Sequence, residues 1–146
     1  MRITRILIEA LCLLLLLGTV IFLIIFWKNI PDSVPTHFDG AGQISGFAGK
    51  RTLLLQPVIM AVLYVSLFFA KTMRFRSFGR QEVRIPAPPL LFPLMKLALL
   101  AGFAYTTVCC SLCRPLGAWY LPVFLGLSLG PMVVWTAIML PRVAKP

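Results

Sequence analysis

The sequence predicts an all-α integral membrane protein with four transmembrane helices. Hydrophobic residues make up 60% of the 146 residues, charged residues make up 12%, and the mean hydropathy is +0.94. A soluble domain of this size could not bury so much apolar surface with so few charged groups left to face water. The formal charge of +10 lies at the ends of apolar runs, which argues against a nucleic-acid partner. The lipid bilayer is the expected surrounding.

Four apolar stretches are long enough to cross the roughly 30 Å hydrocarbon core of a bilayer. We expect helices over residues 6–27, 53–70, 90–113 and 117–140, in one membrane domain that spans residues 1–146. Prolines crowd the starts of the second and third stretches, and a proline is tolerated in the first turn of a helix. The first stretch is too long for a signal peptide and precedes no small-residue cleavage site, so we expect it to remain as an anchor.

Basic residues predict the orientation of these helices. Nine of them flank one side of the predicted spans and four flank the other. Because short loops rich in Lys and Arg stay in the cytoplasm, we expect both termini and a basic loop at residues 71–89 to lie inside. The loop at residues 28–52 then lies outside, in a multi-pass protein of the inner (cytoplasmic) membrane. The four outer basic residues are Lys28, Lys50, Arg51 and Arg114.

Two charged residues interrupt the apolar stretches. Glu9 follows Arg5 by four residues, so a local pair at the level of the lipid headgroups is favoured over a buried functional carboxylate. Lys96 lies about two turns from the expected cytoplasmic end of the third stretch. We expect its long side chain to reach the membrane interface rather than to serve a pathway.

Two further patterns have both a packing and a functional interpretation. A Cys-Cys-x-x-Cys run begins at Cys109 and ends at Cys113, and no second C-x-x-C is present. Packing is therefore favoured over redox chemistry or metal binding for these thiols. Gly126 and Gly130 have the spacing that lets helices approach closely, and Pro131 follows at once. This spacing favours packing within the chain over a homodimer.

The outer loop carries the most information about function. It reads NIPDSVPTHFDGAGQISGFAGKRT from Asn29 to Thr52, with many turn-forming residues and apolar residues at intervals. This composition predicts an ordered, compact loop rather than a linker. We expect Phe38 and Phe47 to pack onto the ends of the helices.

His37 is the only histidine and lies close to Asp32 and Asp39 in the sequence. Imidazole and carboxylate groups carry protons and bind metals, which keeps a small transporter subunit or a membrane enzyme open as an alternative function. A structural role for His37, in which it fixes the loop, has equal weight. We also expect His37 and Lys50 to lie near one another or near a shared partner. Because no nucleophile and base pair or phosphate loop is visible, we assign no catalytic residue, cofactor or metal ligand and expect no enzyme.

A longer motif includes these residues: Pro-x-x-[Val/Ile]-Pro-x-His-Phe-[Asn/Asp], followed by a glycine-rich stretch and a closing lysine. Residues 31–50 supply it, although Ser45 stands where such loops usually carry an aspartate. Over residues 29–52 and the flanking helices, the chain thereby resembles the bacterial membrane domain of unknown function found in immunity proteins of the SdpI type. The resemblance implies that the loop binds a secreted peptide toxin or another membrane or envelope partner. The binding or loop-structuring residues would be Pro31, Pro35, Thr36, His37, Phe38, Asp39, Gly46 and Lys50.

Overall fold

The computed structural model describes residues 2–69 and 90–143, with side chains for residues 3–69 and 90–138, and it is mostly helical. A short 3-10 helix, η1 (Lys50–Leu54), leads directly into α2. Four spans in the described residues are long and apolar enough to cross a bilayer, as the sequence predicts. The chain is therefore a multi-pass membrane protein, and the predicted basic loop at residues 71–89 lies outside the described residues. The α-helices are α1 (Arg2–Phe26), α2 (Leu55–Phe69), α3 (Leu91–Ser111) and α4 (Tyr120–Val143).

The prediction of an all-α fold is wrong at the loop between α1 and α2, which forms a β-hairpin. Strand β1 (Ser33–Phe38) pairs antiparallel with β2 (Ile44–Gly49). The register pairs Pro35 with Phe47 and then His37 with Gly46, so the ladder is irregular directly after the proline. A proline cannot donate a ladder hydrogen bond, and such an irregularity is where a strand tolerates one.

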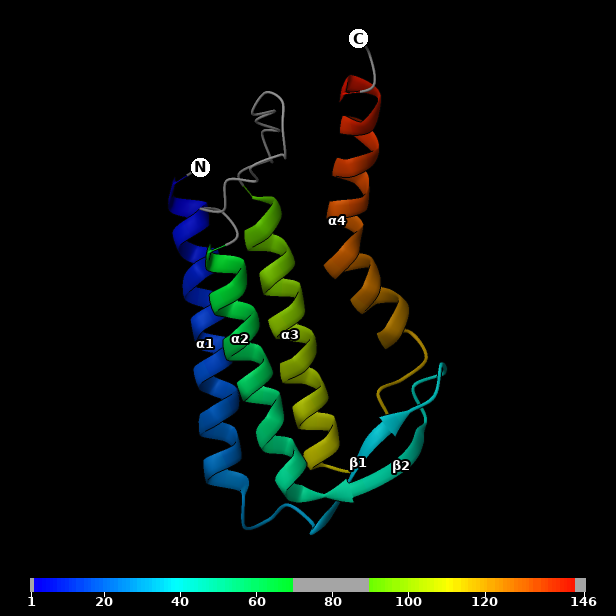
Figure 1. The fold of residues 1–146 in the computed structure, drawn as a ribbon. Helices are drawn as coiled ribbons and strands as arrows, with labels where there is room; N and C mark the ends of the chain where they lie inside the picture. The colour runs from blue at the N-terminus through cyan, green and yellow to red at the C-terminus, as the bar shows by residue number, and fades with distance from the viewer. Residues whose placement is uncertain (1, 70–89, 144–146) are drawn as a thin grey trace, which may run out of the picture.

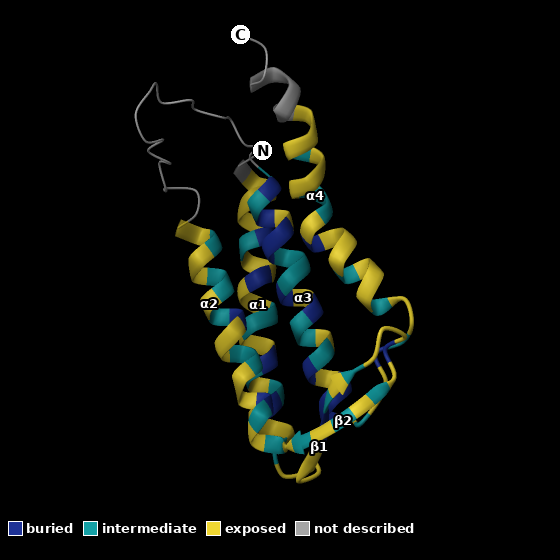
Figure 2. Ribbon diagram, turned by 45° about the vertical axis from the view of Figure 1, so that its right-hand side comes forward, coloured by how far each residue is buried: buried dark blue, intermediate teal, exposed yellow. Residues whose placement is uncertain are grey.

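Successive helices run in opposite directions, so Arg2 at the start of α1 and Val143 at the end of α4 lie at one end of the molecule and the hairpin lies at the other (Figure 1). Helix α3 is central, because it packs against α1, α2, α4 and the hairpin strand β1. Most buried positions lie where α1, α2 and α3 meet, whereas α4 stands to one side and is largely exposed (Figure 2). In a bilayer, the exposed apolar side chains face lipid.

Helix α4 approaches α3 at a glycine that the sequence analysis does not single out. A Cβ built on Gly102 would lie 2.2 Å from the Phe124 ring, so the absence of a side chain lets Phe124 of α4 reach the α3 backbone. The Tyr120 hydroxyl donates to the Gly102 carbonyl at 3.0 Å and lies 2.7 Å from the Thr106 hydroxyl. The expected intramolecular packing at Gly126 and Gly130 is not found among the described residues, none of which lies within 4 Å of a Cβ built at either position.

Replacing Gly102 with Ala is expected to lower the free energy of unfolding by about 1 to 3 kcal/mol, the usual cost of overpacking. The Phe124 ring cannot simply turn away, because it stacks on Tyr120 at 5.5 Å between ring centroids. Gly126→Ala is the matched control, and it should be neutral or slightly stabilising because alanine is the better helix former. Thermal unfolding of both variants in the same detergent tests the prediction, and equal midpoints would contradict it.

Helix α3 ends two residues before the predicted boundary because Cys113 leaves the helical conformation. Cys113 has a φ of 51°, its N–H donates to the Cys110 carbonyl, and the Arg114 N–H donates to the Cys109 carbonyl at 2.9 Å. These two bonds are the Schellman arrangement that commonly closes a helix, usually at a glycine. The Cys-Cys-x-x-Cys run therefore lies at the C-terminal end of α3: Cys109 and Cys110 are in its last turn, and Cys113 is the residue at which the helix is closed. Cys109 and Cys110 are buried, as expected for thiols that pack.

Candidate functional site

The hairpin is seated on the helix ends by a small apolar core. Val34 of β1 and Ile30, which precedes the strand, are buried with Leu23 of α1, Leu53 of η1 and Cys110 of α3. Burying such side chains contributes about 1.5 to 3 kcal/mol each relative to leaving them exposed. The hairpin is thereby fixed to three helical elements, so the predicted order of the loop is confirmed.

The two loop phenylalanines differ in environment. Phe38 is partly buried against the apolar core under the hairpin, as predicted. Phe47 is 60% exposed, so the expectation that it packs onto the helix ends is wrong. The reason lies in the strand pattern: Ser45, Phe47 and Gly49 of β2 share the exposed face, because successive strand residues point to opposite sides.

Asp39 organises the turn between the strands. Its Oδ1 atom accepts hydrogen bonds from the backbone N–H groups of Ala41 at 2.9 Å and Gln43 at 2.8 Å. Gly42 has a φ of 72°, and its carbonyl accepts a hydrogen bond from the N–H of Leu116 at 2.9 Å. The tip of the hairpin is therefore tied to the connection between α3 and α4, which it reaches across the molecule (Figure 1).

Lys50 and Asp32 close the other end of the hairpin. The Lys50 ammonium lies 2.7 Å from the Asp32 carboxylate and 5.8 Å from the centroid of the Trp27 ring. This hydrogen bond and charge hold the pKa of the Asp32 carboxyl below its ordinary value. The N–H of Lys50 also donates to the Asp32 carbonyl, so side chains and backbone join the same two residues. Pro31, which precedes them, is exposed, whereas Pro35 is buried.

His37 is exposed and covers Gly46 on the opposite strand. A Cβ on Gly46 would lie 3.2 Å from the Cβ of His37, so the glycine leaves room for the imidazole. Nδ1 of His37 lies 3.1 Å from the hydroxyl of Thr36. His37 and Lys50 are not neighbours, because Lys50 lies beyond Gly49, which pairs with Ser33 at the far end of the ladder. A partner shared by the two residues stays a prediction.

The structure does not gather His37, Asp32 and Asp39 into one site. Asp32 is paired with Lys50 and Asp39 accepts two backbone hydrogen bonds in the turn. Within residues 2–69 and 90–143, no group of three His, Cys, Asp or Glu side chains is placed to hold a metal ion. The predicted residues instead belong to a structured hairpin. Asp39 accepts the hydrogen bonds of its turn, and Gly46 pairs with His37 on the opposite strand.

A second polar site lies inside the helix bundle, and sequence reasoning missed it. The Lys96 ammonium of α3 donates a hydrogen bond to the Glu9 carboxylate of α1. The Lys96 side chain is 1% exposed and that of Glu9 is 21% exposed. The expectation that Lys96 reaches the interface is therefore wrong, and Glu9 has an interhelical partner rather than only a local one.

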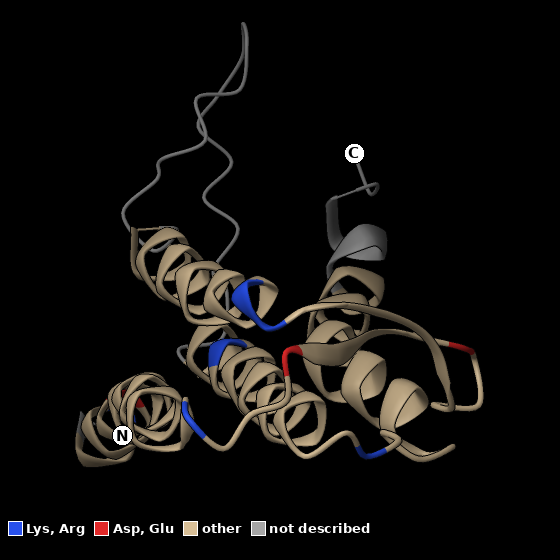
Figure 3. Ribbon diagram, turned by 90° about the horizontal axis from the view of Figure 1, so that it is seen from below, with Lys and Arg blue, Asp and Glu red and all other residues tan. Residues whose placement is uncertain are grey.

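Helix α2 completes the surroundings of this ion pair. The ring centroid of Tyr64 lies 4.2 Å from the Lys96 ammonium and that of Phe68 lies 5.9 Å away, so both rings present a cation–π face to the charge. Nearer the hairpin, the Thr107 hydroxyl of α3 donates to the side-chain oxygen of Gln56 of α2. Polar contacts thus join α3 to α1 and to α2 within an otherwise apolar bundle. Figure 3, which looks onto the hairpin end, shows how few charged positions the helices carry.

The comparisons with known proteins concern the hairpin and its two flanking helices. Residues 14–61 match the family described as Domain of unknown function (DUF1648). An uncharacterized protein of Archaeoglobus fulgidus is 27% identical over 63 residues, which cover 42% of this chain and 34% of that protein. The chain thus spans about a third of the length of this relative. No solved structure matches this chain significantly. The matched segment runs from α1 through the hairpin into α2, so this multi-pass membrane protein carries a segment similar to the domain of unknown function.

Proposed function

We propose that the protein binds a secreted peptide or another cell-envelope partner at its hairpin, as the resemblance to SdpI-type immunity proteins implies. In this proposal the hairpin lies outside a bacterial cytoplasmic membrane and both termini lie inside. The supporting observation is the distribution of basic residues, nine on the side of the termini and four on the side of the hairpin. A secreted partner would then meet the hairpin first.

The observation that carries the proposal is a hairpin seated on the helix ends with one exposed aromatic side chain, Phe47. Val34 and Gly42 anchor the two ends of the hairpin, whereas Phe47 on β2 is exposed. The described sheet has two strands, so each strand has an edge without a strand partner. An extended peptide binds such an edge through its backbone, and an aromatic side chain beside it supplies affinity. A seated surface also loses little conformational freedom on binding.

The alternative of a transporter subunit or an enzyme that uses the outer histidine and aspartates receives less support. That function needs His37 to share a substrate or an ion with Asp32 or Asp39. Asp32 is engaged by Lys50, and Asp39 accepts two backbone hydrogen bonds in the turn. The hairpin is therefore better suited to binding a partner than to moving protons.

Survival of cells challenged with a secreted peptide encoded beside the gene tests the proposal. The wild-type protein should protect, and Phe47→Ser should raise the peptide sensitivity by about tenfold, the effect of losing an aromatic hot spot worth roughly 1.4 kcal/mol. The matched control is Ser45→Ala, an exposed change on the same strand face that removes no ring. Both variants should accumulate to the wild-type level, because neither side chain is buried. Full protection by Phe47→Ser, or no protection by the wild type, would contradict a binding role of the hairpin.

A further inference from the structure

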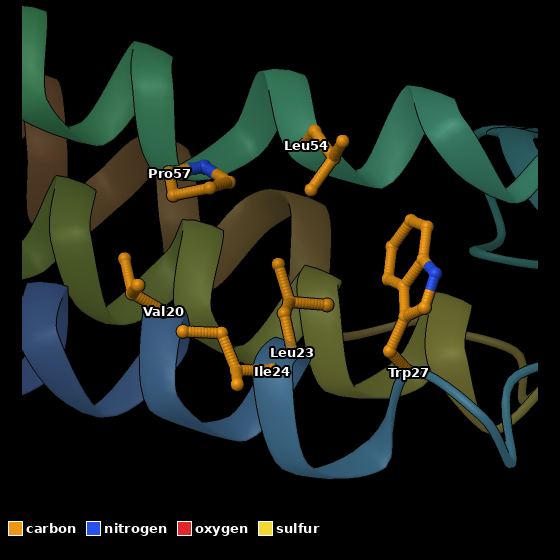
Figure 4. Close-up of a pocket in the computed structure, with 6 residues that line it drawn as sticks. All are labelled: Val20, Leu23, Ile24, Trp27, Leu54 and Pro57. Carbon is orange, nitrogen blue, oxygen red and sulfur yellow. The ribbon is translucent and has the colours of Figure 1, made fainter.

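An apolar slot opens between α1 and α2 next to the hairpin. Figure 4 shows three side chains of α1, together with Trp27 just after its end, facing two side chains from η1 and α2 across the slot. It encloses about 330 Å³, which falls within the range of about 300 to 1,000 Å³ found for small-molecule sites. Leu23 is buried at its floor, whereas Ile24 and Leu54 are exposed at its rim. The six lining residues are Val20, Leu23, Ile24, Trp27, Leu54 and Pro57.

One basic side chain, that of Lys50, is placed at the end of this slot near the hairpin, and two further basic residues are adjacent in the sequence to Trp27 and Lys50. Lys50, at the start of η1, places its ammonium 5.8 Å from the centroid of the Trp27 ring that lines the slot. Lys28 follows Trp27 directly and Arg51 follows Lys50, and both side chains are exposed. One carboxylate, that of Asp32, lies at Lys50. Because an ammonium group has three N–H donors, Lys50 retains the capacity to donate to a second anion.

We propose that this slot binds one acyl chain of an anionic phospholipid from the leaflet at the hairpin end. An apolar slot within a membrane-spanning segment suits a hydrocarbon chain, and the slot alone would accept the chain of any lipid. Lys50 beside Trp27, with Lys28 and Arg51 next to these two residues in the sequence, would favour a headgroup with net negative charge, since basic residues near a bilayer surface attract anionic lipids. The bound lipid would fill the gap between α1 and α2 beneath the hairpin.

The proposal does not depend on a peptide partner, and it holds for either orientation of the protein in the membrane. Its consequence is a second role for Lys50, which joins the hairpin to the slot through Asp32 and Trp27. Lipid in the slot would contact the same lysine that closes the hairpin. The composition of that leaflet would therefore influence how firmly the hairpin is held.

Photolabelling of the purified full-length protein in nanodiscs tests the site. The probes are phosphatidylglycerol and phosphatidylcholine that carry the same photoreactive acyl chain. Labelled peptides should come from Val20 to Trp27 and from Leu54 to Pro57, with phosphatidylglycerol the stronger label. Replacing Lys28 and Arg51 with Gln should lower the preference for phosphatidylglycerol by about fivefold for each charge removed.

Val20→Phe and Leu54→Phe fill the slot from its two walls and should each abolish most labelling there. Ile21→Phe is the matched control, because Ile21 is 54% exposed on the same helix and does not line the slot. Circular dichroism and elution volume establish that each variant is folded, and loss of labelling in one folded wall variant is sufficient support. Equal labelling by the two lipids, or wild-type labelling in both wall variants, would overturn the proposal. If Ile24→Cys forms crosslinked dimers and the slot shows no lipid labelling, the slot is occupied by a second copy of the protein. That outcome would also overturn the lipid proposal.

Discussion

Replacing Glu9 with Gln is expected to lower the free energy of unfolding by about 3 to 5 kcal/mol, the cost of leaving a buried charge without its partner. The stranded group would be the Lys96 ammonium, which is 1% exposed among α1, α2 and α3. Lys96→Met should cost less, because the group left without its partner, the Glu9 carboxylate, is less buried, at 21% exposed against 1% for Lys96. Unfolding of the purified protein in detergent, followed by circular dichroism, measures both changes.

The double variant, Glu9→Gln with Lys96→Met, should recover most of the stability that Glu9→Gln loses, because no unpaired charge remains. The control for a purely local role is Arg5→Gln, which alters an exposed residue one turn before Glu9. An exposed ion pair contributes about 0 to 1 kcal/mol, so this change should be nearly neutral. A loss for Glu9→Gln that is no larger than the loss for Arg5→Gln would show that the interhelical pair contributes little.

The pairing of Glu9 with Lys96 also shows where reasoning from sequence stops. Apolar length predicts all four helices, because crossing a bilayer requires a minimum run of apolar residues and each stretch has one. Length says nothing about which helices become neighbours. Glu9 and Lys96 are 87 residues apart, so the nearest basic residue in the sequence, Arg5, is the more obvious partner. The useful signal is that the two residues lie at a similar depth in the membrane. Each is one to two turns from the helix end that lies away from the hairpin.

The hairpin is missed for a different reason. Pro35 argues against a strand, and β2 consists largely of small residues with little preference for extended structure. Its formation depends on tertiary contacts, since Val34 is buried by α1, η1 and α3, which come from three parts of the sequence. Two of the motif residues have a structural role in the hairpin: Asp39 accepts the hydrogen bonds of its turn, and Gly46 leaves room for His37. Their role in binding stays a prediction.

Replacing Gly42 with Ala is expected to lower the free energy of unfolding by on the order of 3 kcal/mol, through two separate effects. Gly42 has a φ of 72°, which an L-residue with a side chain adopts at a cost of about 1 to 2 kcal/mol. A Cβ would also lie 2.4 Å from the Gly117 carbonyl oxygen, and this backbone cannot turn aside as a flexible side chain could. The tip of the hairpin should therefore leave the connection between α3 and α4.

Hydrogen exchange locates this loss, because the N–H of Leu116 donates to the Gly42 carbonyl at 2.9 Å. In Gly42→Ala the Leu116 amide should exchange much faster, whereas amides in the middle of α1 should change little. Gly40→Ala is the matched control in the same turn, since no described residue lies within 4 Å of a Cβ built there and its φ is not in the left-handed region. A Leu116 amide as well protected in Gly42→Ala as in Gly40→Ala would mean that the hairpin tip is not anchored by this contact. If the prediction holds, Gly42 is the residue that lets one hairpin span the bundle from the end of α1 to the start of α4.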